Sequence, residues 1–211
     1  MDQYITLFFN GSHSLYMDGV AWNATQTWVW IPLFLIILYT LFREHDLRHF
    51  FFLLALLLLS VVIADQVASS IFKPWIARWR PTHNPQIAQW VDIVNGYRGG
   101  LYGFFSSHAA NTATLATTLS LLFQNRRTSL SLSSWVLLNC WTRIYLGVHY
   151  FGDLLVGLLL GILLGGLAYR CYRVVFCNSY QHHYYPPLQN NITTIYLLTL
   201  IFLSIPWRLC F

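Results

Sequence analysis

The chain has 211 residues, of which 56% are hydrophobic, 18% are aromatic and only 9% are charged. A soluble domain carries about 25% charged residues, so this composition indicates an integral membrane protein and excludes an ordinary soluble domain. The net charge of +5 does not indicate nucleic-acid binding, because the chain lacks a polar face on which basic residues could gather. We therefore interpret the basic residues as determinants of membrane topology and as ligands for anions.

Apolar runs long enough to cross a bilayer recur along the chain. A membrane helix needs about 20 mainly apolar residues. Such segments predict six spans, at about 25–42, 49–72, 105–123, 130–147, 151–171 and 191–207. They should be helical, because a helix satisfies its backbone N–H and C=O groups within the segment, as lipid requires. We therefore predict an all-α, polytopic membrane protein with a central helical bundle, in which residues 1–211 form a single domain.

Two segments do not fit a membrane span. Residues 1–23 predict a short amphipathic segment at the membrane interface, and residues 74–104 form the one long connection, rich in Pro, Gly and Trp. The aromatic residues of this connection are typical of the belt at a membrane–water interface. An alternative is that some of them shape a lateral path for an acyl or prenyl chain. In either case the connection is expected at one membrane surface.

The distribution of basic residues predicts the orientation in the membrane. On one side, six arginines lie in three loops, near 43–48, 124–129 and 170–190. The other side also carries six basic residues, but three of them belong to the charged clusters described below, namely Lys73, Arg80 and Arg143. Excess Lys and Arg marks the cytoplasmic side. With those three set aside, both termini and the long connection are expected outside.

The fifth expected span contains three glycines spaced four residues apart, Gly157, Gly161 and Gly165. Small residues at this spacing form a ridge that lets another helix approach closely. We interpret the ridge as a packing feature. It also leads us to expect that the helix following the sequence HYFGD lies centrally, against other helices rather than against lipid.

Three clusters of ionisable and polar residues fall on the same predicted side, each where a span begins or ends. They are KPWIARWRP with Lys73 and Arg80, FFSSHAANT with Ser106, Ser107 and His108, and TRIYLGVHYFGD with Arg143, His149 and Asp153. Ionisable groups within a membrane cost about 2.5–3.5 kcal/mol each on insertion scales, so they persist mostly where they have a function. Each cluster alone could be a snorkelling anchor or a helix cap. Together they predict one shared pocket.

The residue types in these clusters suit phosphoryl transfer. His149 and Asp153 are four residues apart, which is one turn of a helix, so the carboxylate could fix the imidazole tautomer and leave Nε2 as a nucleophile. His108 could protonate a leaving oxygen. The pattern therefore predicts a covalent phosphohistidine intermediate.

The remaining residues of the clusters suit phosphate binding. Guanidinium and ammonium groups match phosphate oxygens, and a helix that begins at a Ser-Ser pair offers its N-terminal N–H groups to an anion. The residues concerned are Lys73, Arg80, Arg143, Ser106 and Ser107. Because these cations can stabilise the developing charge, we expect that no metal ion or other cofactor is needed.

At these positions the chain resembles the type 2 phosphatidic acid phosphatase family of membrane lipid phosphatases. The family pattern is Lys-x6-Arg-Pro, then Pro-Ser-Gly-His, then Ser-Arg-x5-His-x3-Asp. The first part is matched in full from Lys73 to Pro81, whereas Phe105 and Ser107 replace Pro and Gly in the second and Thr142 replaces Ser in the third. Since glycine permits a closer backbone approach, the Cβ of Ser107 is expected to narrow the pocket or shift its donors.

The resemblance implies roles for individual residues. His149 would attack phosphorus, Asp153 would orient it, and His108 would protonate the departing group. The phosphate would be held by Lys73, Arg80, Ser106, Ser107 and Arg143. The expected enzyme is a lipid phosphatase acting on a phosphomonoester or diphosphate at the extracytoplasmic face, with undecaprenyl diphosphate, phosphatidylglycerol phosphate, phosphatidic acid and the phosphates of lipid A as candidate substrates.

The same observations predict the cellular location and the partners of the protein. The compact chain, without an evident signal peptide or extra domain, favours a bacterial inner membrane with the active site facing the periplasm. The expected partners are the bilayer and its lipid phosphate, and no nucleic acid is expected. Oligomeric state does not follow from the sequence.

Two other functions remain open from the sequence alone. A binder or transporter of lipid phosphates would keep the pocket and lack turnover, so release of phosphate separates it from an enzyme. A membrane di-iron oxidase or desaturase would use His45 and His49, at HxxxH spacing, with His182 and His183 on the same predicted side. Such enzymes need many converging histidines, but this chain has eight and two of them belong to the outer clusters.

Overall fold

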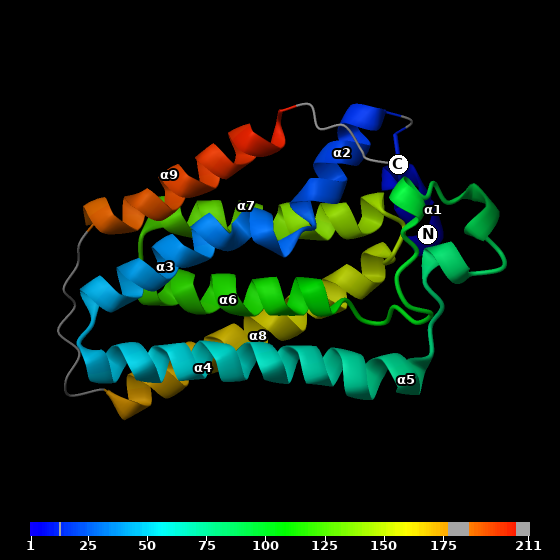
Figure 1. The fold of residues 1–211 in the computed structure, drawn as a ribbon. Coiled ribbons are helices and arrows are strands. Elements are labelled where there is room, and N and C mark those ends of the chain that lie inside the picture. The colour runs from blue at the N-terminus through cyan, green and yellow to red at the C-terminus, as the bar shows by residue number, and fades with distance from the viewer. Residues whose placement is uncertain (13, 177–185, 206–211) are drawn as a thin grey trace.

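The computed structural model describes residues 1–12, 14–176 and 186–205. Within these ranges the chain is helical, with no strand beyond an isolated bridge between Trp79 and Tyr102. Six long helices form an elongated bundle (Figure 1). They are α3 (Ile31–Glu44), α4 (Leu47–Gln66), α6 (Ser107–Phe123), α7 (Arg126–Tyr145), α8 (Phe151–Val175) and α9 (Pro186–Leu203). The all-α prediction is therefore confirmed for the described residues.

Three helical segments are long and apolar enough to cross a membrane. They are Thr27–Glu44, where the 3₁₀ turn η1 (Thr27–Trp30) leads into α3, Leu47–Ile76, which includes α4, and Phe151–Val175, which is α8. The other three long helices are more polar or shorter: α6 has 17 residues rich in Ala and Thr, and α7 is rich in Ser. Within the described residues, the six expected segments are therefore largely helical, and three helical segments have the composition of a span by themselves.

The outward surfaces of the bundle are apolar. Leu35 and Phe42 on α3, Leu58 and Leu59 on α4, and Leu159 and Leu163 on α8 are all exposed. Soluble monomers rarely expose contiguous apolar patches larger than a few hundred Å². A bundle with leucine and phenylalanine along several outer helix faces is stable only where lipid covers them, so the protein is an integral membrane protein.

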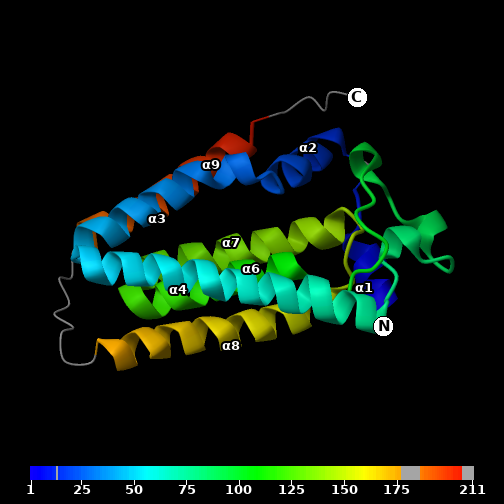
Figure 2. The same cartoon turned by 60° about the horizontal axis from the view of Figure 1, so that its bottom comes forward.

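Helix α6 occupies the centre of the bundle, between α4, α7 and α8 (Figures 1 and 2). Its closest partner is α8, and the glycine ridge is the reason. A Cβ at Gly157 would lie 2.5 Å from the backbone oxygen of Ser106, the N-cap of α6, and a Cβ at Gly165 would lie 2.7 Å from a backbone oxygen within α6. A Cβ at Gly161 would overlap the backbone oxygen of Ala110. The packing interpretation of the ridge is confirmed. The expectation that α8 lies centrally is wrong, because its opposite face is exposed and α6 takes that place.

The N-terminal segment folds into two helices at one end of the bundle. Helix α1 (Asp2–Phe9) packs against the start of α8 and the end of α7, and α2 (Leu15–Ala24) packs against α7. Tyr4 and Phe8 on α1 remain largely exposed. The segment is therefore helical, and it covers the same end of the bundle as the long connection (Figure 1).

The long connection begins later than the sequence suggests. Helix α4 continues through the π-helical segment η2 (Val67–Phe72) into α5 (Lys73–Ile76), so Lys73 lies in a helix. Pro74 explains the irregularity, because proline has no N–H to donate to the preceding helical turn. Single π-helical turns are frequent at functional sites. The remaining residues, 77–106, contain the 3₁₀ turns η3 (Pro81–His83), η4 (Ala88–Trp90) and η5 (Val94–Gly96).

Candidate active site

Lys73 and the first turn of α6 meet at one end of the bundle. The Nζ of Lys73 donates to the Oγ of Ser69 at 3.1 Å and to the Oγ of Ser107 at 3.3 Å. Ser106 is the N-cap of α6, as expected, and its Oγ accepts the N–H of Ala109 at 3.4 Å. An ammonium group therefore lies beside a helix N-terminus, and both favour an anion.

The two residues that depart from the family pattern in this segment have identifiable contacts. Ser107 supplies the hydroxyl that accepts from Lys73, a group that glycine would lack. Phe105 is 2% exposed and packs against Phe72 of the π-helical segment, with ring centroids 5.3 Å apart. Both side chains therefore help to join the end of α4 to the start of α6.

Arg80 is held by backbone oxygens next to His149. Its Nε donates to the carbonyl oxygen of Tyr102 and its Nη1 to that of Val148, both at 3.1 Å. The same Nη1 lies 3.4 Å from the Nε2 of His149. Gly99 makes room for this arrangement, because its φ is +66° and a Cβ there would lie 2.9 Å from Nη1. The guanidinium is thus fixed beside the nitrogen that the sequence predicts to be the nucleophile.

Arg143, in the last turn of α7, is a buried cation with spare hydrogen-bond donors. The residue is 3% exposed, and it forms no ion pair with any described residue. Its Nη1 lies 3.5 Å from the Nε2 of His108, while its Nη2 has no hydrogen-bond partner among the described residues. The guanidinium also interacts with the side chain of Tyr97. A buried guanidinium in this state is suited to receive an anion.

His149 and Asp153 are neighbours, but not through one helical turn. Helix α8 begins at Phe151, so His149 precedes it and Asp153 is its third residue. The Oδ2 of Asp153 accepts the N–H of Tyr150 at 3.0 Å and lies 3.6 Å from the Nδ1 of His149. The interpretation that placed both residues on one helical face is therefore wrong. The distance also exceeds a normal hydrogen bond, so in this conformation Asp153 acts on the imidazole through its charge.

The imidazole of His149 is only 2% exposed. Burial lowers the pKa of His149 to about 4, Arg80 and Arg143 act in the same direction, and Asp153 opposes them. The ring is therefore neutral near pH 7, which is the state that a nucleophilic nitrogen requires. Gly103 packs against this pair, since a Cβ there would lie 3.3 Å from the Oδ2 of Asp153 and 3.5 Å from the Nδ1 of His149.

The structure adds two residues that sequence reasoning missed. The Nη1 of Arg78 donates to the Oδ1 of Asp153 and its Nη2 to the Oδ2 of Asp2, both at 2.6 Å. From the sequence Arg78 counted only as a topological charge, although its place between Lys73 and Arg80 was an available signal. Asp2 gave no comparable signal, because only the tertiary fold brings α1 to this site.

The inner histidines lie at the opposite end of the bundle. The Nδ1 of His49 is 2.8 Å from the hydroxyl of Tyr172, and its ring stacks near that of Phe176 with centroids 4.0 Å apart. His182 and His183 lie outside the described residues. Within the described ranges, no group of three or more His, Cys, Asp and Glu side chains is arranged to hold a metal ion. His49 is thus part of an aromatic cluster.

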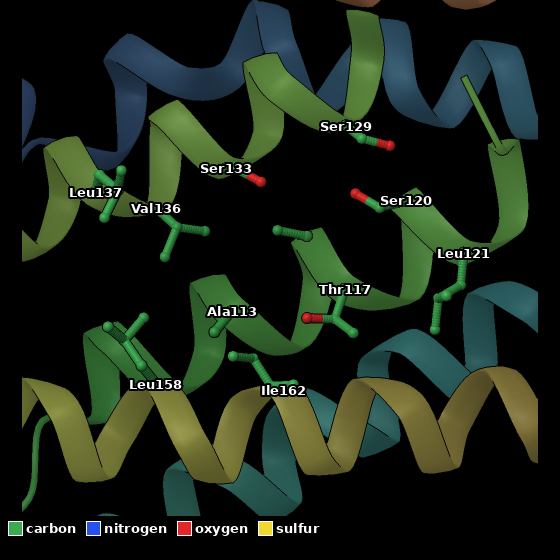
Figure 3. A pocket seen from close by; sticks show the side chains of 11 residues that line it. Ala113, Thr117, Ser120, Leu121, Ser129, Ser133, Val136, Leu137, Leu158 and Ile162 are labelled. Atoms are coloured by element: carbon green, nitrogen blue, oxygen red, sulfur yellow. The ribbon is translucent and has the colours of Figure 1, made fainter. Parts of the chain in front are cut away.

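A cavity of about 500 Å³ lies between α6, α7 and α8 (Figure 3). Its lining consists of apolar side chains with several hydroxyls, among them Ala113, Thr117, Ser120, Ser133 and Ile162. None of the described lining residues is titratable, and none belongs to the three predicted clusters. The charged groups at the end of the bundle, rather than this cavity, are therefore the candidate active site.

The apolar bundle and the convergent cations and histidines together define a class, an integral membrane protein with a site suited to a phosphate group. Residues 54–177, more than half of the chain, match the model of a family described as the PAP2 superfamily. The chain belongs to the PAP2 superfamily, so the resemblance found in the sequence is confirmed. Together with the two curated relatives described next, this membership shows that the protein is a phosphoric ester hydrolase.

Two curated relatives are similar over most of the chain. A protein named lipid A 4'-phosphatase from Porphyromonas gingivalis is 36% identical over 172 residues, which cover 82% of this chain and 73% of the relative. A protein of the same name from Bacteroides thetaiotaomicron is 40% identical over 171 residues, which cover 80% of this chain and 76% of the relative. No solved structure is significantly similar to the chain. The di-iron alternative loses its support, since the family and both relatives indicate a phosphatase.

Proposed function

We propose that the protein removes a phosphate group from lipid A at the periplasmic face of the inner membrane, through a phosphohistidine at His149. The observation that carries this proposal is the convergence on two histidines of Arg80 and of Arg143, whose Nη2 has no hydrogen-bond partner among the described residues. The names of the two curated relatives support lipid A among the four candidate lipids. Their names also favour the 4'-phosphate, a phosphomonoester.

The proposed phosphate-binding site has contributions from four elements. Lys73 lies at the end of the α4–α5 helix, Arg80 in the connection and Arg143 on α7. Ser106 and Ser107 stand where α6 begins; the N–H of Ser106 donates to the carbonyl oxygen of Asp153 at 3.1 Å, so the proposed contribution of these two residues is their hydroxyls and the N–H groups of the first turn of α6. Three cations and a helix N-terminus offset the charge of a phosphate dianion and of the transition state. In this proposal the chemistry needs no metal ion.

The proposed reaction has two steps. In the first, the Nε2 of His149 forms a bond to phosphorus while the bond from phosphorus to the lipid oxygen breaks, and His108 gives its proton to that oxygen. The negative phosphate supports a protonated His108 when it binds. In the second step water attacks phosphorus, His108 accepts a proton from the water, and the P–N bond breaks to regenerate His149 and release inorganic phosphate.

The proposed topology has six membrane spans with the active site outside. The more polar helices α6 and α7 are compatible with this topology because protein covers much of their surface, as the buried Thr112, Thr114 and Thr118 on α6 illustrate. The arginines of the opposite loops are compatible with a cytoplasmic location under the positive-inside rule. A lipid headgroup in the outer leaflet could then reach the site without crossing the membrane.

Phosphate release by the detergent-purified protein tests the proposal. Wild type and His149→Ala are compared in the presence of EDTA on lipid A, phosphatidic acid, phosphatidylglycerol phosphate and undecaprenyl diphosphate. We expect release from lipid A by wild type alone, loss of the 4'-phosphate by mass spectrometry, and an acid-labile phosphohistidine after rapid quenching. Near-normal activity of His149→Ala would overturn the mechanism. Binding of lipid A without phosphate release by wild type would favour a lipid-phosphate binder.

A further inference from the structure

Both oxygens of the Asp153 carboxylate are occupied by groups other than His149. Oδ2 accepts the backbone N–H of Tyr150 at 3.0 Å, and Oδ1 accepts from Arg78 at 2.6 Å. Asp153 is completely buried, so these two contacts determine where its charge lies relative to the imidazole. The contact from Arg78 is the short, charge-assisted one.

Arg78 is itself held from two further sides. Its second donor, Nη2, binds the carboxylate of Asp2 at 2.6 Å, and its guanidinium lies over the ring of Tyr150, 4.0 Å from the centroid. Burial opposes the charge on Arg78, but the hydrogen bond to Asp2 and the charges of Asp153 and Asp2 together raise the pKa of Arg78 above its ordinary value. The guanidinium is therefore a fixed cation between two carboxylates.

Asp2 also binds the helix that carries Asp153. Its Oδ1 accepts the N–H of Gly152 at 2.9 Å, and the hydroxyl of Thr6 accepts the N–H of Phe151 at 3.2 Å. These are the first two N–H groups of α8, which have no partner within their own helix. Helix α1 therefore caps α8 from outside, at the turn that contains Asp153 and directly follows His149.

We propose that Arg78 and Asp2 are positioning residues that hold the Asp153 carboxylate beside His149, and that α1 is thereby part of the active site. The inference rests on the proposed nucleophilic role of His149. Arg78 binds one oxygen of Asp153 and leaves the other directed toward the imidazole. Asp2 fixes Arg78 and the first turn of α8 together, so that the chain of contacts from α1 ends at the nucleophile.

The test compares Arg78→Gln, Arg78→Lys and Asp2→Asn in the full-length protein in detergent, with lipid A as substrate. Arg127→Gln is the matched control, because Arg127 is exposed at the far end of α7. We expect Arg78→Gln to lower kcat about 10- to 100-fold, the size of effect that a misplacement of about 1 Å produces. Arg78→Lys should recover part of the loss. Asp2→Asn should lower kcat about two- to fivefold, as expected for an ion pair whose side chains are 31% and 32% exposed.

Inhibition by inorganic phosphate shows whether each variant retains a folded phosphate site. The inhibition constant should stay within about threefold of wild type, since Arg78 makes no contact with the proposed phosphate ligands. The fold-decrease in kcat of the double variant Asp2→Asn/Arg78→Gln should be smaller than the product of the fold-decreases of the two single variants, because Asp2 acts largely through Arg78. If the two decreases in kcat simply multiplied in the double variant, this would contradict the inference that Asp2 acts through Arg78.

The protonation of His149 provides a readout that a purely structural role would not move. Asp153 raises the pKa of His149, so a carboxylate that moves away in Arg78→Gln should let the pKa of His149 fall below its wild-type value, as followed by ¹⁵N resonances of labelled histidine. The other ionisable groups that face His149 are retained in this variant, namely Asp153 on α8, Arg80 in the connection, Arg143 on α7 and His108 on α6. Arg127→Gln should leave the titration where it is in wild type.

The outcomes separate this inference from the proposed function. Unchanged kcat in Arg78→Gln together with an inactive His149→Ala would overturn the positioning role and keep the nucleophile. Activity in His149→Ala would instead overturn the function on which the inference rests. A lower kcat in Arg78→Gln with an unmoved His149 titration would also contradict the inference, since Asp153 would then act on the imidazole as it does in wild type.

Discussion

Replacement of Arg143 by methionine should change stability and phosphate binding in opposite directions. Arg143 is 3% exposed, its Nη2 has no hydrogen-bond partner among the described residues, its contacts to Thr142 and His108 are long at 3.4 and 3.5 Å, and it forms no ion pair with a described residue. A buried charge without a counter-ion destabilises the folded state, and apolar side chains of similar volume are often neutral or stabilising in its place. We therefore expect Arg143→Met to unfold, without ligand, at the same temperature as wild type or above it.

The same replacement, Arg143→Met, should weaken phosphate binding. Hydrogen bonds to charged groups contribute about 1.5–3 kcal/mol each. At 1.36 kcal/mol for each factor of ten, the loss of one such contact corresponds to an inhibition constant for inorganic phosphate raised about 10- to 150-fold. Wild type at a phosphate concentration of 100 times its dissociation constant should gain about 2.7 kcal/mol of stability, and the variant should lose about half to nine-tenths of this gain.

Thermal unfolding in detergent with and without phosphate, together with phosphate inhibition of lipid A hydrolysis, measures both effects. Arg127→Met serves as the control, because Arg127 is exposed at the other end of the same helix and should change neither quantity. A variant Arg143→Met that unfolds well below wild type and keeps its inhibition constant would refute the reasoning. Arg143 would then be a structural residue of the bundle.

Two other features lead to measurable expectations. Gly161→Ala should lower the stability by about 1–3 kcal/mol in thermal or denaturant unfolding, because its Cβ would overlap a backbone oxygen of α6, whereas Gly166→Ala has open space. Equal stability of the two variants would contradict close packing of α6 and α8. Because burial lowers the pKa of His149 to about 4, its ring should stay neutral as the pH falls from 7 to 5. A ¹⁵N titration assigned with His149→Ala checks this, and a midpoint near 6.5 would refute it.

The helices were predictable because their cause is local. Segments such as 151–171 are apolar along their whole length, and lipid leaves the backbone of such a segment little alternative to a helix. The predicted ends of the segments were less accurate. The span expected to end at about residue 72 continues as a helix to Ile76, because a π-helical turn accommodates Pro74. The three-glycine spacing identified a packing ridge, but it did not show that the central helix is α6, the partner of the ridge.

The candidate site was only partly predictable. Spacing within KPWIARWRP and TRIYLGVHYFGD singled out Lys73, Arg80, Arg143, His149 and Asp153, and the structure brings these side chains to one end of the bundle. Their chemical roles stay predictions until tested. The spacing of His149 and Asp153 suggested a helical turn, whereas the chain uses Asp153 to cap a helix that begins after His149. A gap of four residues is compatible with both arrangements, so it could not distinguish them.

By itself, the sequence determined the helical membrane character, the family and the residue types available for phosphate chemistry, because all of these depend on composition and short-range spacing. Only the tertiary structure decided how Asp2, Arg78 and Asp153 are connected. Asp2 and Gly152 are 150 positions apart, and their contact exists because α1 folds back onto the first turn of α8. A contact over such a separation leaves no periodic trace in a single sequence, since it depends on how the intervening helices pack and not on the residues between.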